Sequence, residues 1–400
     1  MKLPNFSKLF RRSKMRPFLV LDIGTVEVKA AIFLPQKEGR LKVLGAARQV
    51  HGHTSFHGCL ITHMDAVIES CSLAIEQASL QAGVSPRETI LLSAGKIRSV
   101  QTKVRLARRD EASLLTEREL DKIFEKVKEK IEPEVYKKAA AIYGVDASQL
   151  YHLGERALEY QLDGKKMDSP VGFTGKELKI SLLDLFCLQK EFKVLTRLSQ
   201  VLDLEMVGFQ SPTMAAASLL REKFGRGIVV DLGGKITEVA VFKEGAMSGG
   251  GCVNWGGYHL TWRLMRRFDL GYDQAERLKL SAGSGGLDED KQRQIDLEFI
   301  GWREILLAGI EEVLRRMLEA EGSVVAGSLP ETMFIIGGGA KTANLKSAFI
   351  AYPWTKRLSF GTFPKPQFVS LLDLVDLEGK ADKLKEPNFL PLVGAAMRQI

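Results

Sequence analysis

The sequence IVVDLGGKITEVAVF, which occupies residues 228–242, has the pattern of two short strands joined by a tight turn. An apolar, β-branched run ends in Asp231, a glycine pair follows, and a second apolar run comes after it. Gly233 and Gly234 permit left-handed backbone conformations and let amide N–H groups face an anion. A carboxylate beside such a turn suits a hydrated divalent metal ion. The stretch alone fits both an ordinary hairpin and one half of a phosphate site.

A second copy of this pattern lies near the start of the chain. Residues 18–33, FLVLDIGTVEVKAAIF, again give a strand, an aspartate (Asp22), a corner containing Gly24 and a returning strand. Self-similarity at long separation indicates two related halves. Two halves that each offer an aspartate and an anion-binding corner predict a two-sided clamp for the phosphates of a nucleotide and its magnesium ion.

Two further segments extend this organisation. The run MFIIGGGA, residues 333–340, reads as a strand that ends in a glycine-rich turn, which is where α/β folds place nucleotides. Residues 96–180 have the pattern of an inserted module. A capping box from Thr116 to Glu119 opens an amphipathic helix, and residues 157–162 and 178–182 alternate as strands do. We therefore expect a small helix-plus-sheet subdomain within the chain.

Composition indicates an ordinary globular chain with several cores. It has 400 residues, of which 45% are hydrophobic and 26% are charged. The net charge of +8 includes six basic residues before residue 17, so that 8 − 6 = +2 remains for the body and nucleic-acid binding is not expected. Four cysteines without CxxC spacing fit reduced thiols in a cytosolic protein. There is no signal-peptide pattern and no apolar run of 18 residues.

The first 16 residues form a basic tail with apolar residues at helical spacing. Such a segment suits the surface of an anionic membrane, and a disordered leader or a contact with another partner are the alternatives. The residues predicted to contact the membrane are Leu3, Phe6, Leu9, Phe10, Arg11 and Arg12. Farther along, His51, His53, His57 and His63 fall close together, but their spacing fits no common zinc site and indicates an ordinary loop.

The three glycine motifs in this order resemble the two phosphate motifs and the adenosine motif of the actin-like ATPase superfamily. Ala275-Glu276-Arg277-Leu278-Lys279 resembles the helix whose Glu and Lys contact the nucleoside there. The resemblance implies that ATP and Mg²⁺ bind between the halves, with Asp22 and Asp231 holding the metal through water. Gln210 would position the attacking water. The remaining implied nucleotide ligands are Gly24, Thr25, Lys29, Gly233, Gly234, Lys235, Thr237, Glu276, Lys279, Gly337, Gly338, Gly339 and Ala340.

The insert resembles that of one branch of this superfamily. Residues 161–164 (QLDG) and 169–178 (SPVGFTGKEL) are similar to the corresponding segment of the bacterial cell-division family FtsA, whose insert is called subdomain 1C. The resemblance implies an α/β actin-like fold of two related mixed-sheet domains around a nucleotide cleft, with an inserted α+β subdomain. The expected units are 17–95 with 181–210 for the first domain, 96–180 for the insert and 211–400 for the second domain.

Function follows from the same resemblance. An FtsA-like protein is expected to bind ATP, hydrolyse it slowly at most, and polymerise into filaments. It is also expected to tether the tubulin-like division protein FtsZ to the inner face of the cell membrane at the septum. Two alternatives fit the motifs: a PilM-type cytoplasmic adaptor of type IV pilus assembly, to which residues 393–398 are somewhat similar, and an actin-fold ATPase or kinase. A kinase needs a carboxylate base facing a substrate hydroxyl, for which the sequence offers no convincing candidate.

Two departures from the FtsA pattern are visible. Lys235 and Ile236 stand where the second phosphate motif of that family has Gly and Thr. Lys235 either points outward on the turn or brings its ammonium to a phosphate. FtsA-type proteins also place their membrane-binding helix at the C-terminus, so here we expect the N-terminal tail, residues 1–16, to take that role.

Overall fold

The computed structural model of the chain describes residues 16–243, 246–282, 289–319, 328–369, 374, 377–384 and 386–398. The tail residues Leu3, Phe6, Leu9, Phe10, Arg11 and Arg12, predicted to contact a membrane, lie outside the described residues. Within these ranges, no helix combines the length and the apolar character needed to cross a bilayer.

The first sheet is built on the N-terminal copy of the repeated pattern. Its strand order is β11-β6-β1-β2-β3-β17. β1 pairs antiparallel with β2 and parallel with β6, and its residues are buried because an apolar run here is covered on both faces. The strands are β1 (Phe18–Ile23), β2 (Glu27–Pro35), β3 (Leu41–Val50), β6 (Glu88–Leu92), β11 (Glu205–Gln210) and β17 (Leu377–Gly379).

The second sheet repeats the topology of the first. Its order is β14-β13-β12-β15-β16, in which β12 again pairs antiparallel with the strand after it and parallel with a later strand. The strands are β12 (Gly227–Leu232), β13 (Thr237–Lys243), β14 (Ala246–Val253), β15 (Thr332–Ile336) and β16 (Lys365–Phe368). The predicted pair of related mixed-sheet halves is thereby confirmed.

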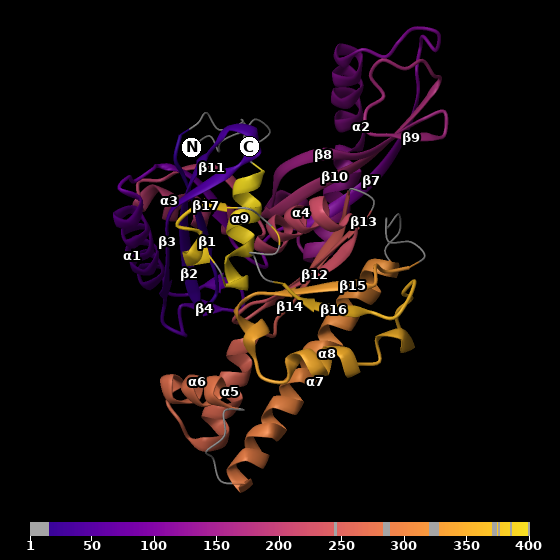
Figure 1. Ribbon diagram of the computed structural model, residues 1–400. Coiled ribbons are helices and arrows are strands. Elements are labelled where there is room, and N and C mark those ends of the chain that lie inside the picture. The colour runs from indigo at the N-terminus through magenta and orange to yellow at the C-terminus, as the bar shows by residue number, and fades with distance from the viewer. Residues whose placement is uncertain are drawn as a thin grey trace.

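Helices separate and cover the two sheets, as Figure 1 shows. α1 (Met64–Ala82) and α3 (Gln189–Val201) bury residues such as Ala74 and Leu195 against the outer face of the first sheet. α4 (Pro212–Phe224) and α9 (Leu390–Met397) contribute to a core shared by both sheets. The second sheet is covered on its other face by α5 (Gly257–Phe268), α6 (Tyr272–Ser281), α7 (Glu289–Glu319) and α8 (Leu345–Ala351).

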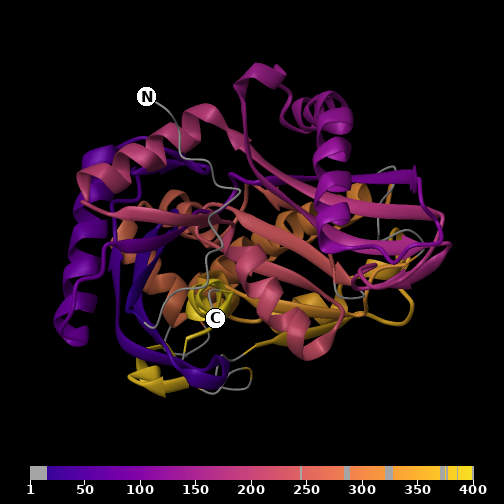
Figure 2. The same ribbon diagram turned by 90° about the horizontal axis from the view of Figure 1, so that it is seen from above.

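The contact between α4 and α9 is close because it is made by small residues. A Cβ added to Gly394 would lie 2.2 Å from the carbonyl oxygen of Ala215, so only glycine lets the two helices approach to this distance. Seen from above, α9 lies in the middle of the molecule, between α1 on one side and α2 (Glu117–Tyr143) of the insert on the other (Figure 2). The helix packs between the two halves, and β17, which precedes it, returns to the first sheet.

The inserted subdomain (residues 98–188) has a sheet of its own, with strand order β7-β10-β8-β9. One face of this sheet packs against α2, whose Val127 and Ile131 are buried. The Thr116 hydroxyl accepts a hydrogen bond from the Glu119 amide at 3.2 Å, which is one half of the predicted capping box. Within the described residues the other half is not formed, because the Glu119 carboxylate pairs with Arg108 instead. β10 continues past residue 180, where we expected the insert to end. The elements are β7 (Arg98–Ala107), α2 (Glu117–Tyr143), β8 (Leu150–Leu162), β9 (Lys165–Met167) and β10 (Glu177–Leu188).

The remaining elements are short. The loop that contains most of the histidines forms a two-stranded sheet of β4 (Phe56–His57) and β5 (Leu60–Ile61). Single 3₁₀ turns occupy Lys37–Gly39, Ala147–Gln149, Gly338–Lys341, Trp354–Lys356, Ala381–Leu384 and Pro387–Phe389. The glycine-rich turn Gly338–Lys341, which follows β15, lines the cleft between the two halves.

Candidate functional site

The two repeated hairpin turns have the same geometry. The Gly24 amide donates to the Glu27 carbonyl at 3.1 Å, and the Gly233 amide donates to the Ile236 carbonyl at 3.1 Å. A Cβ on either glycine would lie 2.7 Å from that carbonyl oxygen, so each turn requires glycine. Because these two amides close their own turns, the phosphate contacts predicted for them would fall instead to the amides that follow. Those belong to Thr25 and Gly234.

The aspartates that precede the turns also occupy equivalent positions, but their cross-strand partners differ in charge. Asp22 pairs with Lys29 in the strand register, whereas Asp231 pairs with Glu238. The Lys29 ammonium lies 2.6 Å from Asp22 Oδ2. Burial lowers the pKa of Lys29, but the charges of Asp22, Glu27 and Asp231 and the hydrogen bond to Asp22 together outweigh burial and raise that pKa. Burial, followed by the charges of Glu238 and Asp22, raises the pKa of Asp231 to about 7. The carboxylate of Asp22 is therefore neutralised by a neighbouring lysine, whereas that of Asp231 faces a second carboxylate.

Glu238 is a buried carboxylate that sequence reasoning missed. One oxygen accepts from the Gly95 amide at 2.7 Å, and the other accepts from the hydroxyls of Ser211 and Thr213 at 2.9 and 2.8 Å. These donors lie before β7 and at the start of α4, so Glu238 ties the second phosphate hairpin to other parts of the chain. Its spacing of seven residues from Asp231, the same as that of Lys29 from Asp22, is the signal that identifies it.

A cavity of about 610 Å³ lies between the halves and is lined by residues from both. This volume is in the range of small-molecule sites. The sequence-predicted residues that line it are Asp22, Gly24, Thr25, Lys29, Asp231, Gly233, Gly234, Glu276, Lys279, Gly337, Gly338 and Gly339. The two glycine hairpins, the turn after β15 and one face of α6 thus line one cavity.

The predicted nucleoside pair lies on one face of α6, as its spacing requires. Lys279 Nζ is 2.7 Å from Glu276 Oε1, and the Thr261 hydroxyl is 2.9 Å from the same ammonium. Burial, partly offset by Glu276, lowers the pKa of Lys279. The pair is therefore held in place by α5 before any ligand arrives.

Four predicted site residues, one of them catalytic and three nucleotide-binding, lie outside the cavity lining. Gln210, proposed to position water, accepts a hydrogen bond from Arg398 at 3.1 Å at the buried end of β11. The Thr237 hydroxyl donates to the Trp255 carbonyl at 2.7 Å. Ala340 packs into the core of the second half rather than toward the cleft. Each of these side chains has a structural partner that accounts for its direction.

Lys235, the fourth of these residues, neither points outward nor lines the cavity. Its side chain is buried, and its ammonium donates to the carbonyls of His53 and Phe56 at 2.5 Å each. The same ammonium lies 4.4 Å from the centre of the Tyr258 ring. The residue that breaks the family pattern therefore fastens the second phosphate hairpin to the loop of residues 51–57 in the first half.

The cleft fits a hydrated cation and an anion. Within the described residues, Asp22 Oδ1 is buried and lacks a hydrogen-bond partner, which suits a cation or a water bound to one. Gly337 has φ of +88°, and a Cβ there would lie 2.4 Å from Asp231 Oδ1, so the turn after β15 approaches the carboxylate closely. Asp22, Asp231 and Glu238 would hold magnesium, whose charge would offset that of phosphates placed against the amides of Thr25 and Gly234.

These features define the class of the protein: the fold is that of the actin-like ATPases. A structure of the PilM-PilN type IV pilus biogenesis complex matches with a TM-score of 0.65 at 16% identity, over 96% of this chain and 99% of that chain. The ethanolamine utilization protein EutJ from Carboxydothermus hydrogenoformans matches with a TM-score of 0.50 at 14% identity, over 97% of this chain and 91% of that one.

Sequence similarity points to one group within this class. The family model for cell division protein FtsA matches residues 228–363. Cell division protein FtsA of Rhizobium meliloti is 26% identical over 69% of this chain, and that of Neisseria meningitidis is 23% identical over 80%. The chain spans 62% of the Rhizobium relative and 75% of the Neisseria relative. The chain is thus FtsA-like, which confirms the resemblance read from its motifs.

Proposed function

We propose that this chain is an ATP-binding actin homologue that acts in bacterial cell division as FtsA-like proteins do. The observation that supports this most strongly is the duplicated cleft, in which two matching glycine turns and their aspartates face one cavity. ATP with magnesium would bridge the halves and favour the closed arrangement. The sequence similarity to cell division proteins supplies the biological setting.

The proposal includes self-association and a division partner. Nucleotide held between the halves would fix their relative orientation, and a fixed orientation favours repeated subunit contacts along a filament. Many weakly attached subunits would then gain avidity at a membrane, where a tubulin-like protein of the FtsZ type would be tethered. The basic tail would supply each subunit's membrane contact, through Leu3, Phe6, Leu9, Phe10, Arg11 and Arg12.

Sedimentation with lipid tests this proposal. Full-length protein, ATP and magnesium would be spun with vesicles of anionic or neutral lipid, with and without an FtsZ-like protein. We expect both proteins to pellet with anionic vesicles only, and deletion of residues 2–14 to release them while ATP binding persists. Pelleting that is unchanged by the deletion would remove the tail from the proposal. An FtsZ-like protein left in the supernatant would remove the tethering role.

An adaptor role is the second candidate, favoured by the likeness to PilM in the PilM-PilN complex over nearly the whole chain. In that case the chain would capture a short segment of a pilus membrane protein instead of a tubulin-like protein. A pull-down with the C-terminal peptide of an FtsZ-like protein, compared with a PilN-type cytoplasmic peptide, separates the two. Selective capture of the second peptide would replace the division proposal with the adaptor.

A further inference from the structure

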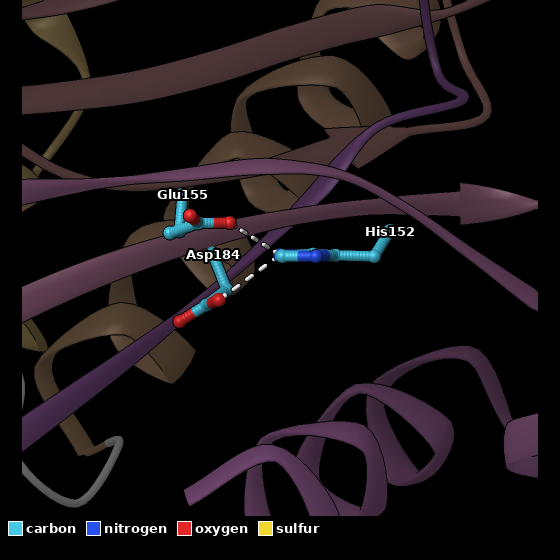
Figure 3. Close-up of side chains that lie close together, drawn as sticks. All are labelled: His152, Glu155 and Asp184. Atoms are coloured by element: carbon cyan, nitrogen blue, oxygen red, sulfur yellow. Dashed lines mark hydrogen bonds and ion pairs between the residues drawn. The ribbon is translucent and has the colours of Figure 1, made fainter. Parts of the chain in front are cut away.

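One histidine and two carboxylates converge on the sheet of the inserted subdomain, away from the cleft. His152 and Glu155 come from β8 and Asp184 from β10 (Figure 3). His152 Nε2 lies 3.0 Å from Asp184 Oδ1 and 3.8 Å from Glu155 Oε2. One ligand atom from each residue lies within 4.8 Å of the others. The nucleotide cleft uses none of the three.

An irregularity in β8 creates this convergence. In a regular strand, residues three apart point to opposite faces, so His152 and Glu155 would diverge. The register shifts here: Glu155 faces Asp184 and Gly154 faces Leu185, but His152 rather than Leu153 faces Phe186. Gly154, with φ of +142°, takes the backbone conformation that this shift needs. The bulge therefore turns the imidazole onto the face that carries both carboxylates.

The cluster has two carboxylates, and Lys128 forms an ion pair with only one of them. Glu155 and Asp184 are directly opposed on neighbouring antiparallel strands, an arrangement that is unfavourable for two like charges. Lys128 of α2 reaches Glu155 Oε1 at 2.5 Å and neutralises one carboxylate. Asp184 is only 6% exposed, and its Oδ2 lacks a hydrogen-bond partner among the described residues. A buried carboxylate oxygen without a partner is costly and points to a ligand.

We propose that His152, Glu155 and Asp184 bind a divalent transition-metal ion, with Zn²⁺ the best match. One imidazole nitrogen and two carboxylate oxygens are ligands that zinc accepts, with water completing the shell. Ligands about 2.0–2.2 Å from a tetrahedral ion lie roughly 3.3 Å apart. The observed separations of 3.0 and 3.8 Å from His152 Nε2 bracket that value. Asp184 Oδ2 would gain its partner by binding the ion or its water.

The imidazole is already oriented for this role. The His152 ring packs against Phe186, with ring centres 4.8 Å apart, and against Tyr136 of α2 at 6.3 Å. These contacts hold Nε2 toward the carboxylates. Binding requires the neutral imidazole with its proton on Nδ1. Lys128 competes with the ion for Glu155. Removing the charge of Lys128 should therefore strengthen metal binding, whereas removing a ligand should weaken it.

Zinc titration of the full-length chain tests the site. Protein stripped of metal would be titrated with Zn²⁺ by calorimetry at neutral pH without nucleotide. We expect one saturable equivalent whose affinity falls at least about 10–100-fold in His152→Gln and in Asp184→Asn. Lys128→Gln should instead increase the affinity, because Glu155 loses its competing cation. The double variant His57→Gln with His63→Gln, in the exposed histidine loop, should bind as the wild type does.

Several results would overturn the proposal. These are absence of saturable binding, affinity that is indifferent to His152→Gln, and loss of binding in the His57/His63 double variant. If His152→Gln does not fold, Lys128→Gln decides alone, and an unchanged or reduced zinc affinity in that variant contradicts the site. Cobalt(II) provides an independent check: we expect d–d absorption without a thiolate charge-transfer band, because no cysteine is among the ligands.

Discussion

At the scale of single residues, the two halves of the cleft have the same backbone turns but differ in the charge beside each aspartate. Asp22 faces a lysine, and Asp231 faces the carboxylate of Glu238. A metal ion would therefore gain most on the side of Asp231, where burial and like charges oppose ionisation. The magnesium site proposed here is thus completed by Glu238 rather than being shared equally between the two predicted aspartates.

The raised pKa of Asp231 predicts a pH-dependent cost to stability. Because its folded pKa is about 7 and its ordinary value is 3.8, the folded state binds the proton more tightly. The stability that this group contributes is present below pH 3.8 and is lost as pH rises through about 7. Without nucleotide, Asp231→Asn should gain about 1–3 kcal/mol relative to wild type on moving from about pH 5 to about pH 8. Denaturant unfolding at both pH values measures this, and an equal difference at both contradicts it.

Lys235 predicts a second residue-scale effect. Lys235→Met keeps the apolar stem but removes the donor to the His53 and Phe56 carbonyls, which should cost about 1–3 kcal/mol. Hydrogen exchange of residues 51–57 should accelerate, whereas Lys243→Met on the same hairpin should leave it unchanged. Unaltered exchange in this loop together with weaker ATP binding would instead assign Lys235 to the phosphates.

The aspartates, the glycines and the Glu276–Lys279 pair predicted from the sequence line one cavity, because backbone turns and helical spacing are local properties. Sequence reasoning did not settle the direction of Lys235, whose acceptors lie about 180 residues earlier in the chain. It also assigned no role to Glu238, which lies in the second apolar run of the hairpin. Long-range hydrogen bonds of this kind leave no periodic signal in the sequence.

At the scale of elements, the turn after β15 is the most sensitive part of the cleft. Gly337 and Gly338 are neighbours in one motif, but only Gly337 has positive φ and a close carboxylate. Gly337→Ala should destabilise the protein by more than about 1–2 kcal/mol and weaken ATP binding. Gly338→Ala, where an added Cβ meets no atom within 4 Å, should change stability by less than about 0.5 kcal/mol. Thermal unfolding of the pair measures this, and equal losses in both variants would contradict it.

Element positions were predictable where the pattern was strongly periodic. The capped helix and the alternating strands of the insert lie where the sequence placed them. The continuation of β10 to Leu188 and the bulge at Gly154 were not foreseen, because register depends on the partner strand. The candidate metal cluster depends on that bulge, so it could be found only from the structure.

At the scale of the whole molecule, α4 and α9 form a shared core between two sheets that carry the same topology. α9 thus packs against both halves. A ligand that bridges the cleft would therefore act on two sheets that share one core. The duplication was visible in the sequence as two copies of one motif. The return of β17 to the first sheet was not, because a strand of three residues carries too little pattern.

The central claim is that one nucleotide is clamped by both halves, and hydrogen exchange of the full-length chain with and without magnesium-ATP tests it most directly. We expect slower exchange at residues 24–26 of the first hairpin, 233–235 of the second and 337–339 after β15, in the same complex and at the same ATP concentration. Asp65, on the exposed side of α1, should show no change. Protection confined to one half, or none at saturating ATP, would contradict the two-sided clamp.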